Sequence, residues 1–180
     1  MKQLYLFITL SFLFISCCNI SAQTTQNFSK GGYYFIRVTD IVDGDTFRGL
    51  TADNKEFKFR LFGIDAPEKK QNYSDKSKQY LSELIQGKTV RIKIQKVKDT
   101  YNRPVIWVYT SDGKEVNSEM LKAGMAWHFK RYDSSATYSN IEKQARRQKN
   151  GLWKDANPVA PWDFRKSHTV PRSLTRGKAF

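Results

Sequence analysis

Residues 60–68 read Arg-Leu-Phe-Gly-Ile-Asp-Ala-Pro-Glu, a run that joins a strand, a turn and two acids. Apolar and basic residues alternate up to Leu61, which is the period of a half-buried strand. A strand that ends at Ile64 places Asp65 and Glu68 at the rim of a barrel, and Pro67 stiffens the turn between them. Carboxylates are the hard oxygen ligands that Ca²⁺ or Mg²⁺ prefers. The alternative is that these acids only cap the entry of a helix.

Segments on both sides of this run have a similar strand pattern, separated by turns rich in Asp, Asn and Gly. Strands are expected at residues 33–38, 41–42, 46–47, 57–62, 89–94 and 105–109. Helical periodicity predicts helices at residues 77–86, 117–123 and 135–149, the second capped by Asn117. The helices do not alternate strictly with the strands, which argues against a doubly wound sheet. We therefore expect a mainly β, α+β fold: a small barrel of about five strands with about three helices.

Composition limits the class of protein and the partners it can take. The chain has 180 residues and a formal net charge of +14, which suits one domain and an anionic partner such as nucleic acid or an anionic membrane. A hydrophobic content of 39% excludes general disorder, and two adjacent cysteines exclude a disulfide scaffold. Core or seam packing is expected for the tryptophans Trp107, Trp127, Trp153 and Trp162.

The first 22 residues have the pattern of an export signal: one lysine, then an apolar run too short to span a bilayer comfortably. Ala22 offers a cleavage site, whereas residues 14–17 loosely match a lipoprotein box, and a buried N-terminal helix or strand is the alternative. We expect an exported protein, secreted, periplasmic or anchored to the envelope through lipid. The remaining divisions are a flexible lead at 23–32, a folded domain at 33–165 and a basic disordered tail at 166–180.

Acids and arginines are the candidate functional residues. Asp45 lies in an Asp-Gly-Asp-Thr turn, which by itself is most simply a hairpin. Arg60 and Arg103 can each hold a phosphate bidentately and oppose charge that develops at phosphorus. In so basic a chain, a single arginine is more often a solvated surface residue.

Taken together, the turn at Asp45, the run at residues 60–68 and the Asp-x-Tyr-x-Arg segment that ends at Arg103 resemble the staphylococcal nuclease (thermonuclease) family in order and spacing. The resemblance extends from about Tyr34 to Trp153 and implies an OB-fold barrel. Asn102 stands where the family usually has Gly, and Asn tolerates a left-handed backbone if one is needed.

The resemblance also implies site roles, residue by residue. Asp45 and Asp65 would be carboxylate ligands of a catalytic Ca²⁺, with the backbone carbonyl of Ala66 as a further ligand. Glu68 would position or deprotonate the attacking water.

Arg60 and Arg103 correspond to the family's two phosphate-binding arginines. Tyr101 and Tyr132 correspond to positions that line the nucleotide pocket, and Lys130 stands where a second pocket tyrosine is expected.

The implied activity is calcium-dependent hydrolysis of DNA and RNA by a monomer, with little sequence specificity and a preference for single-stranded regions. The products would carry 3′-phosphate and 5′-hydroxyl ends. A non-catalytic nucleic-acid-binding OB module is the alternative, and a basic adhesion or scaffolding protein on the cell envelope is a weaker one. The retained acids and arginines favour the enzyme.

Overall fold

The computed structural model describes residues 27–168, so the predicted export signal and the part of the predicted tail beyond residue 168 lie outside the described residues. The strands are β1 (Tyr33–Asp43), β2 (Thr46–Leu50), β3 (Glu56–Leu61), β4 (Ile64–Asp65), β5 (Thr89–Lys96), β6 (Val105–Tyr109) and β7 (Trp127–His128). The helices are α1 (Ser74–Ile85), α2 (Val116–Lys122), α3 (Ala136–Arg147), the 3₁₀ helix η1 (Gly151–Lys154) and α4 (Pro161–His168). None of these helices has the length and apolar character needed to cross a membrane.

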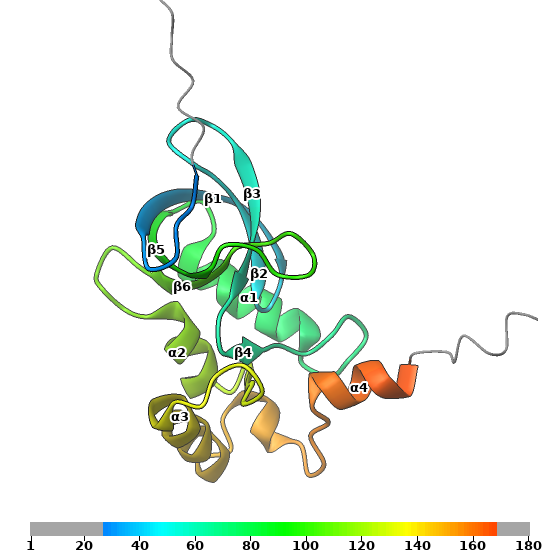
Figure 1. The fold of residues 1–180 in the computed structure, drawn as a ribbon. Helices are drawn as coiled ribbons and strands as arrows, with labels where there is room; N and C mark the ends of the chain where they lie inside the picture. Colours follow the sequence, from blue (N-terminus) through cyan, green and yellow to red (C-terminus); the bar gives the residue numbers. More distant parts are fainter. Residues whose placement is uncertain (1–26, 169–180) are drawn as a thin grey trace, which may run out of the picture.

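Five strands close a barrel in the order β1-β2-β3-β6-β5 (Figure 1). Neighbouring barrel strands are antiparallel except β3 and β6, whose parallel pairing closes the barrel. The long strand β1 pairs with both β2 and β5, and register shifts near Asp40 and Asp43 mark where it bends between them. The predicted five-stranded OB-type α+β fold is therefore confirmed.

Apolar side chains fill the barrel. Phe47 and Phe59 are fully buried and stack with ring centroids 5.3 Å apart. Helix α1 contributes Leu81 and Ile85 to the same core, because these residues lie one helical turn apart on its buried face. This helix covers one end of the barrel and lies beside the turn between β1 and β2.

Helices α3, η1 and α4 gather below the barrel in the view of Figure 1, around a second apolar cluster, whereas α2 contributes Met120 and Leu121 to the barrel core. Trp127 and Trp153 pack edge to face with ring centroids 4.5 Å apart, and Trp162 contacts Trp127 in the same way at 5.6 Å. The guanidinium of Arg146 lies over Trp153 at 3.7 Å from the ring centre. The prediction of core or seam packing describes these three tryptophans well. Trp107 lies half-buried on the outer face of the barrel, where it packs edge to face with Phe62 at 4.7 Å between ring centroids.

The structure corrects three predictions at the level of single elements. Asn117 is not a helix cap, because α2 begins one residue earlier and the Asn117 amide is fully buried. Its oxygen accepts from the Val108 N–H at 3.0 Å, and its nitrogen donates to the carbonyls of Phe62 at 3.0 Å and Ile106 at 3.2 Å. Residues 161–168 form α4, so the first residues of the predicted tail, 166–168, are helical. Within the predicted flexible lead, Phe28 packs against the barrel aromatics.

Candidate active site

The β1–β2 turn carries Asp45 and is pressed against helix α1. A Cβ atom on Gly44 would lie 1.9 Å from the Ser77 hydroxyl, so only glycine fits between the turn and the helix. Asp45 is buried, and one of its oxygens accepts from the Ala66 N–H at 2.7 Å. The other oxygen accepts from the Thr46 hydroxyl at 3.0 Å. The turn and the segment after β4 are thus joined through one carboxylate.

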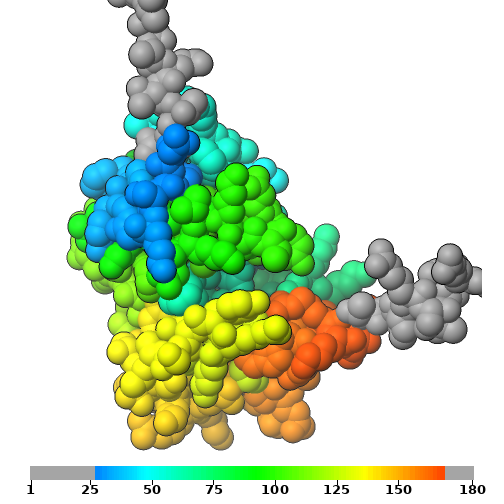
Figure 2. All heavy atoms as spheres, viewed as in Figure 1, coloured from blue at the N-terminus to red at the C-terminus, as the bar shows by residue number. Residues whose placement is uncertain are grey.

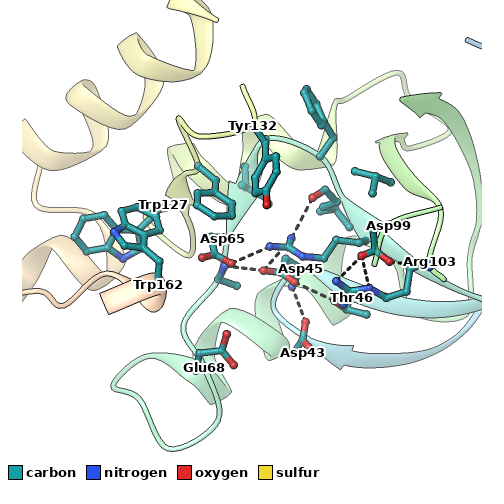
Figure 3. Close-up of a pocket in the computed structure, with 18 of the residues that line it drawn as sticks. Asp43, Asp45, Thr46, Asp65, Glu68, Asp99, Arg103, Trp127, Tyr132 and Trp162 are labelled. Carbon is teal, nitrogen blue, oxygen red and sulfur yellow. Dashed lines mark hydrogen bonds and ion pairs between the residues drawn. The ribbon is translucent and has the colours of Figure 1, made fainter. Parts of the chain in front are cut away.

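Asp65 is held in place by β4, which pairs with β7 outside the barrel. The pairing sets Asp65 opposite Trp127. The bend that leads into β4 depends on Gly63, which has a φ of 73° and whose added Cβ would lie 2.8 Å from the Tyr138 ring. The side chain of Asp65 consequently points into the same space as Asp45 (Figure 3).

Arg60 lies between the two aspartates and binds both. Its guanidinium nitrogens lie 3.0 Å from Asp45 Oδ2 and 2.8 Å from Asp65 Oδ1, and the arginine side chain is only 13% exposed. A third bond runs from Arg60 to the Leu61 carbonyl at 3.1 Å. The predicted metal ligands and one predicted phosphate-binding arginine therefore meet in one buried cluster (Figure 3).

Glu68 lies at the edge of this cluster, and its nearest cationic partner was not predicted. Arg165 of α4 forms an ion pair with Glu68 and another with Asp65, the latter with Nη2 at 2.8 Å from Oδ2. The sequence offered no signal for Arg165, because it lies about a hundred residues from Asp65 and Glu68 along the chain. The structure thus adds an arginine to the predicted set.

Arg103 approaches from the loop between β5 and β6 and is held by Asp99, a second residue that was not predicted. The Arg103 guanidinium lies 2.8 Å from Asp99, whose other oxygen accepts the Tyr101 and Arg103 N–H groups at 2.9 Å. Asn102 at the tip has a φ of 60°, so the left-handed backbone anticipated there is present. Although burial acts to raise it, hydrogen bonds from Arg103 hold the pKa of Asp99 below its usual value.

An open groove of about 1780 Å³ runs past the cluster, between the barrel and the C-terminal helices, and contains every predicted site residue in its lining. Figure 2 shows it as a crease between the blue-to-green barrel and the yellow-to-orange helices. Tyr101 and Tyr132 are 78% and 64% exposed at this groove, and Lys130 is exposed as well. Phe129 and Trp162 stack nearly parallel on its floor. The groove therefore offers aromatic faces beside cationic groups.

The electrostatics of the cluster are dominated by buried carboxylates. Burial, followed by the neighbouring Asp45 charge, raises the pKa of Asp43 to about 7. Burial also raises the pKa of Asp65, against the hydrogen bond from Arg165. Burial is the main cause of both shifts, because it disfavours the charged form of a carboxylate, and a cation among these oxygens would favour that form.

The oxygen donors fit a hard divalent cation such as Ca²⁺, but the side chains supply too few of them to complete its coordination shell. Within residues 27–168, no three His, Cys, Asp or Glu side chains come together as a metal-binding group. Asp45 and Asp65 alone do not complete a coordination shell of six to eight oxygens, so the Ala66 carbonyl and water would have to supply the rest. Both carboxylates are already engaged by arginines, which a bound cation would have to displace or share.

The fold is a five-stranded barrel, and its groove holds paired buried carboxylates, two arginines and exposed tyrosines. Together these features define an OB-fold enzyme suited to phosphodiesters. Residues 58–155 match the family model described as "Staphylococcal nuclease homologue". The chain is 41% identical over 129 residues, 72% of its length and 83% of the other protein, to an "Uncharacterized endonuclease" of Escherichia coli. It is 42% identical over 134 residues, 74% of each chain, to an "Uncharacterized endonuclease" of Haemophilus influenzae. A "Staphylococcal-like nuclease CAN1" of Arabidopsis thaliana is 39% identical over 113 residues, 63% of this chain and 34% of that one. The chain belongs to the staphylococcal nuclease family.

Proposed function

We propose that the protein is a calcium-dependent endonuclease that hydrolyses DNA and RNA with little sequence specificity and leaves 3′-phosphate and 5′-hydroxyl ends. Family membership supports nuclease activity, and the resemblance to the family implies the product ends and the acceptance of both DNA and RNA. The observation that supports the metal and phosphate chemistry is Arg60, held between Asp45 and Asp65 at the floor of an open basic groove. The two carboxylates provide oxygens for a cation, and the arginine that they share provides a hydrogen-bond donor for the phosphate beside it.

The residues of the chain divide the work of phosphodiester hydrolysis. When bound to Asp45, Asp65 and the Ala66 carbonyl, Ca²⁺ would supply Lewis-acid stabilisation of the phosphoryl oxygens. Arg60 and Arg103 donate hydrogen bonds where negative charge grows in the transition state. Glu68, at the edge of the cluster, positions or deprotonates the attacking water.

Substrate binding relies on charge and stacking, which carry no sequence information. The exposed rings of Tyr101 and Tyr132 stack bases, and Lys130 attracts phosphate. Stacking of this kind requires unpaired bases, so single-stranded regions are the preferred substrate. The protein acts as a monomer and is exported; the signal-like segment at residues 1–22 supports the proposal of export.

The test is hydrolysis of heat-denatured DNA with added Ca²⁺ and then with EGTA. We expect cleavage that the chelator abolishes, and 5′-hydroxyl ends that polynucleotide kinase labels without prior dephosphorylation. Glu68→Gln should lose turnover while it keeps DNA binding, whereas Glu83→Gln, an exposed change on α1 away from the groove, should behave as the wild type. DNA binding without cleavage in the wild type would favour the second candidate, a non-catalytic binding module.

A further inference from the structure

The outer face of the barrel carries a regular arrangement of rings and cations on β1, β5 and β6, which are adjacent strands (Figure 1). Strand pairing aligns two rows across these strands, and each row reads aromatic, cation, aromatic. One row is Tyr33, Lys93 and Trp107, and the next is Phe35, Arg91 and Tyr109. We call these six residues the outer aromatic patch.

The cations of the outer aromatic patch lie against the rings. The Lys93 ammonium is 5.5 Å from the ring centres of both Tyr33 and Trp107. The Arg91 guanidinium is 5.4 Å from the Tyr33 ring and 5.3 Å from the Tyr109 ring. Cation–π contacts at these distances keep the basic groups on the plane of the sheet, beside the ring faces.

Exposure and charge separate this patch from ordinary sheet packing. Cross-strand pairs stabilise a sheet, yet Phe35 is 70% exposed and Tyr33 is 54% exposed. The other strongly exposed aromatic residues of the described chain are the two groove tyrosines, Tyr101 and Tyr132. The patch residues include no acid, and the adjacent Glu115 uses its carboxylate to accept hydrogen bonds from Ser118 and Tyr138.

The patch is continuous with the catalytic groove along its own strands. Side chains alternate along a strand, so the outward residue before Trp107 on β6 is Val105. The outward residue after Lys93 on β5 is Gln95, which lies at the register shift between Ile94 and Lys96. Gln95 and Val105 both line the groove. A nucleic-acid strand that leaves the groove along this face therefore reaches Lys93 and Trp107, the first residues of the patch.

We propose that the outer aromatic patch is a second binding surface for single-stranded nucleic acid, on which the strand continues beyond the catalytic groove. This inference rests on the proposed nuclease function, which provides the polyanion. Bases stack on the exposed rings, and phosphates pair with Arg91 and Lys93, so the surface adds affinity for long substrates without reading sequence. An anionic membrane would also attract cations and aromatic side chains, but continuity with the groove favours the nucleic acid.

Binding is measured by fluorescence anisotropy in EGTA, where no cleavage is needed, with labelled dT oligomers. One oligomer of about 30 nucleotides exceeds the ~4–16 that one OB fold covers, and another of about four fills only the groove. Phe35→Ala should weaken binding of the long oligomer about tenfold and leave the short one unchanged, because one stacking platform is lost. Phe35→Trp should keep the wild-type affinity for the long oligomer, because tryptophan also offers a ring for stacking. A purely structural role of Phe35 would not predict this result.

A double variant tests the cations. Arg91→Gln with Lys93→Gln removes two phosphate contacts, so the slope of log affinity against log salt should fall by about 1.4 for the long oligomer. Lys143→Gln with Arg147→Gln, an equal charge change at exposed positions on α3 away from the groove, should leave the slope nearly unchanged.

Three results would overturn the inference. The first is wild-type affinity for the long oligomer in both patch variants, and the second is an equal loss of affinity for the long and the short oligomer. The third is that the patch variants lose binding to phosphatidylglycerol vesicles while they keep nucleic-acid binding, which would assign the patch to a membrane. Wild-type cleavage with Ca²⁺, measured separately, reports on the proposed function, so failure of one proposal is distinguishable from failure of the other.

Discussion

Replacement of Asn117 by alanine should destabilise the protein far more than an ordinary polar-to-alanine change on a helix. The Asn117 side chain is fully buried and makes three hydrogen bonds to the backbone of other segments. The Ile106 carbonyl keeps a partner in the variant, because it also accepts from the Phe62 N–H at 2.7 Å. The Val108 N–H and the Phe62 carbonyl lose the bond from Asn117 while they stay buried.

The magnitude follows from these two groups. A buried polar group left without its partner costs about 1–3 kcal/mol, so the variant should lose about 4 kcal/mol of unfolding free energy. For a chain of this size that loss corresponds to a fall in Tm of about 12 °C. Asn117→Asp should be at least as damaging, because its carboxylate can still accept from Val108 but faces two carbonyl oxygens.

The assay is urea and thermal unfolding followed by circular dichroism, with Ser118→Ala as the control on the same helix. Ser118 donates one hydrogen bond, to Glu115 at 3.0 Å, so its removal should cost about 1 kcal/mol. If Asn117→Ala unfolds within about 1 kcal/mol of the wild type, as the control should, the reasoning from orphaned backbone groups is wrong.

Two further changes probe the site. Asp99→Asn weakens the ion pair that holds Arg103, so we expect a higher KM for single-stranded DNA in steady-state cleavage assays, with the fold preserved; an unchanged KM would mean that Asp99 does not position the arginine. Because the Asp99 pKa is depressed in the folded protein, its stabilisation is complete above about pH 4 and is lost as the pH falls further, so the stability gap between wild type and variant should close in acid unfolding. Arg165→Gln frees the two carboxylates that Arg165 occupies, so Ca²⁺ should bind more tightly. Because Arg165 is partly exposed and solvent weakens its ion pairs, we expect only about a fivefold gain in affinity, measured by calorimetry. Unchanged or weaker binding would show that the arginine does not compete with the cation.

The parts of the site that could be predicted from sequence are those carried by short continuous segments. Residues 60–68 encode a strand, a glycine bend and two acids in one run, so Arg60 and Asp65 could be placed near each other from local geometry alone. Their meeting with Asp45 was implied by the family resemblance, because strand alternation predicts a barrel but not which turns come together in it.

The parts that could not be predicted depend on contacts between distant segments. Arg165 is one of 31 basic residues, and nothing in its own neighbourhood distinguishes it from a solvated side chain. Asn117 stands just where a helix-capping residue would, and only the fold reveals that its amide bonds to Phe62 and Ile106 instead.

The pairing of β4 with β7 affects the order in which this protein can acquire its activity. All barrel strands lie between residues 33 and 109, so every barrel partner is present once that stretch has been made. Asp65, however, is fixed by a strand at Trp127–His128 and contacted by Arg165 still later in the chain. Chains are synthesised from the N-terminus and fold as segments become available. A growing chain can therefore pair its barrel strands before β7, which fixes Asp65, has been made, so the capacity to cut nucleic acid arrives after the barrel pairing.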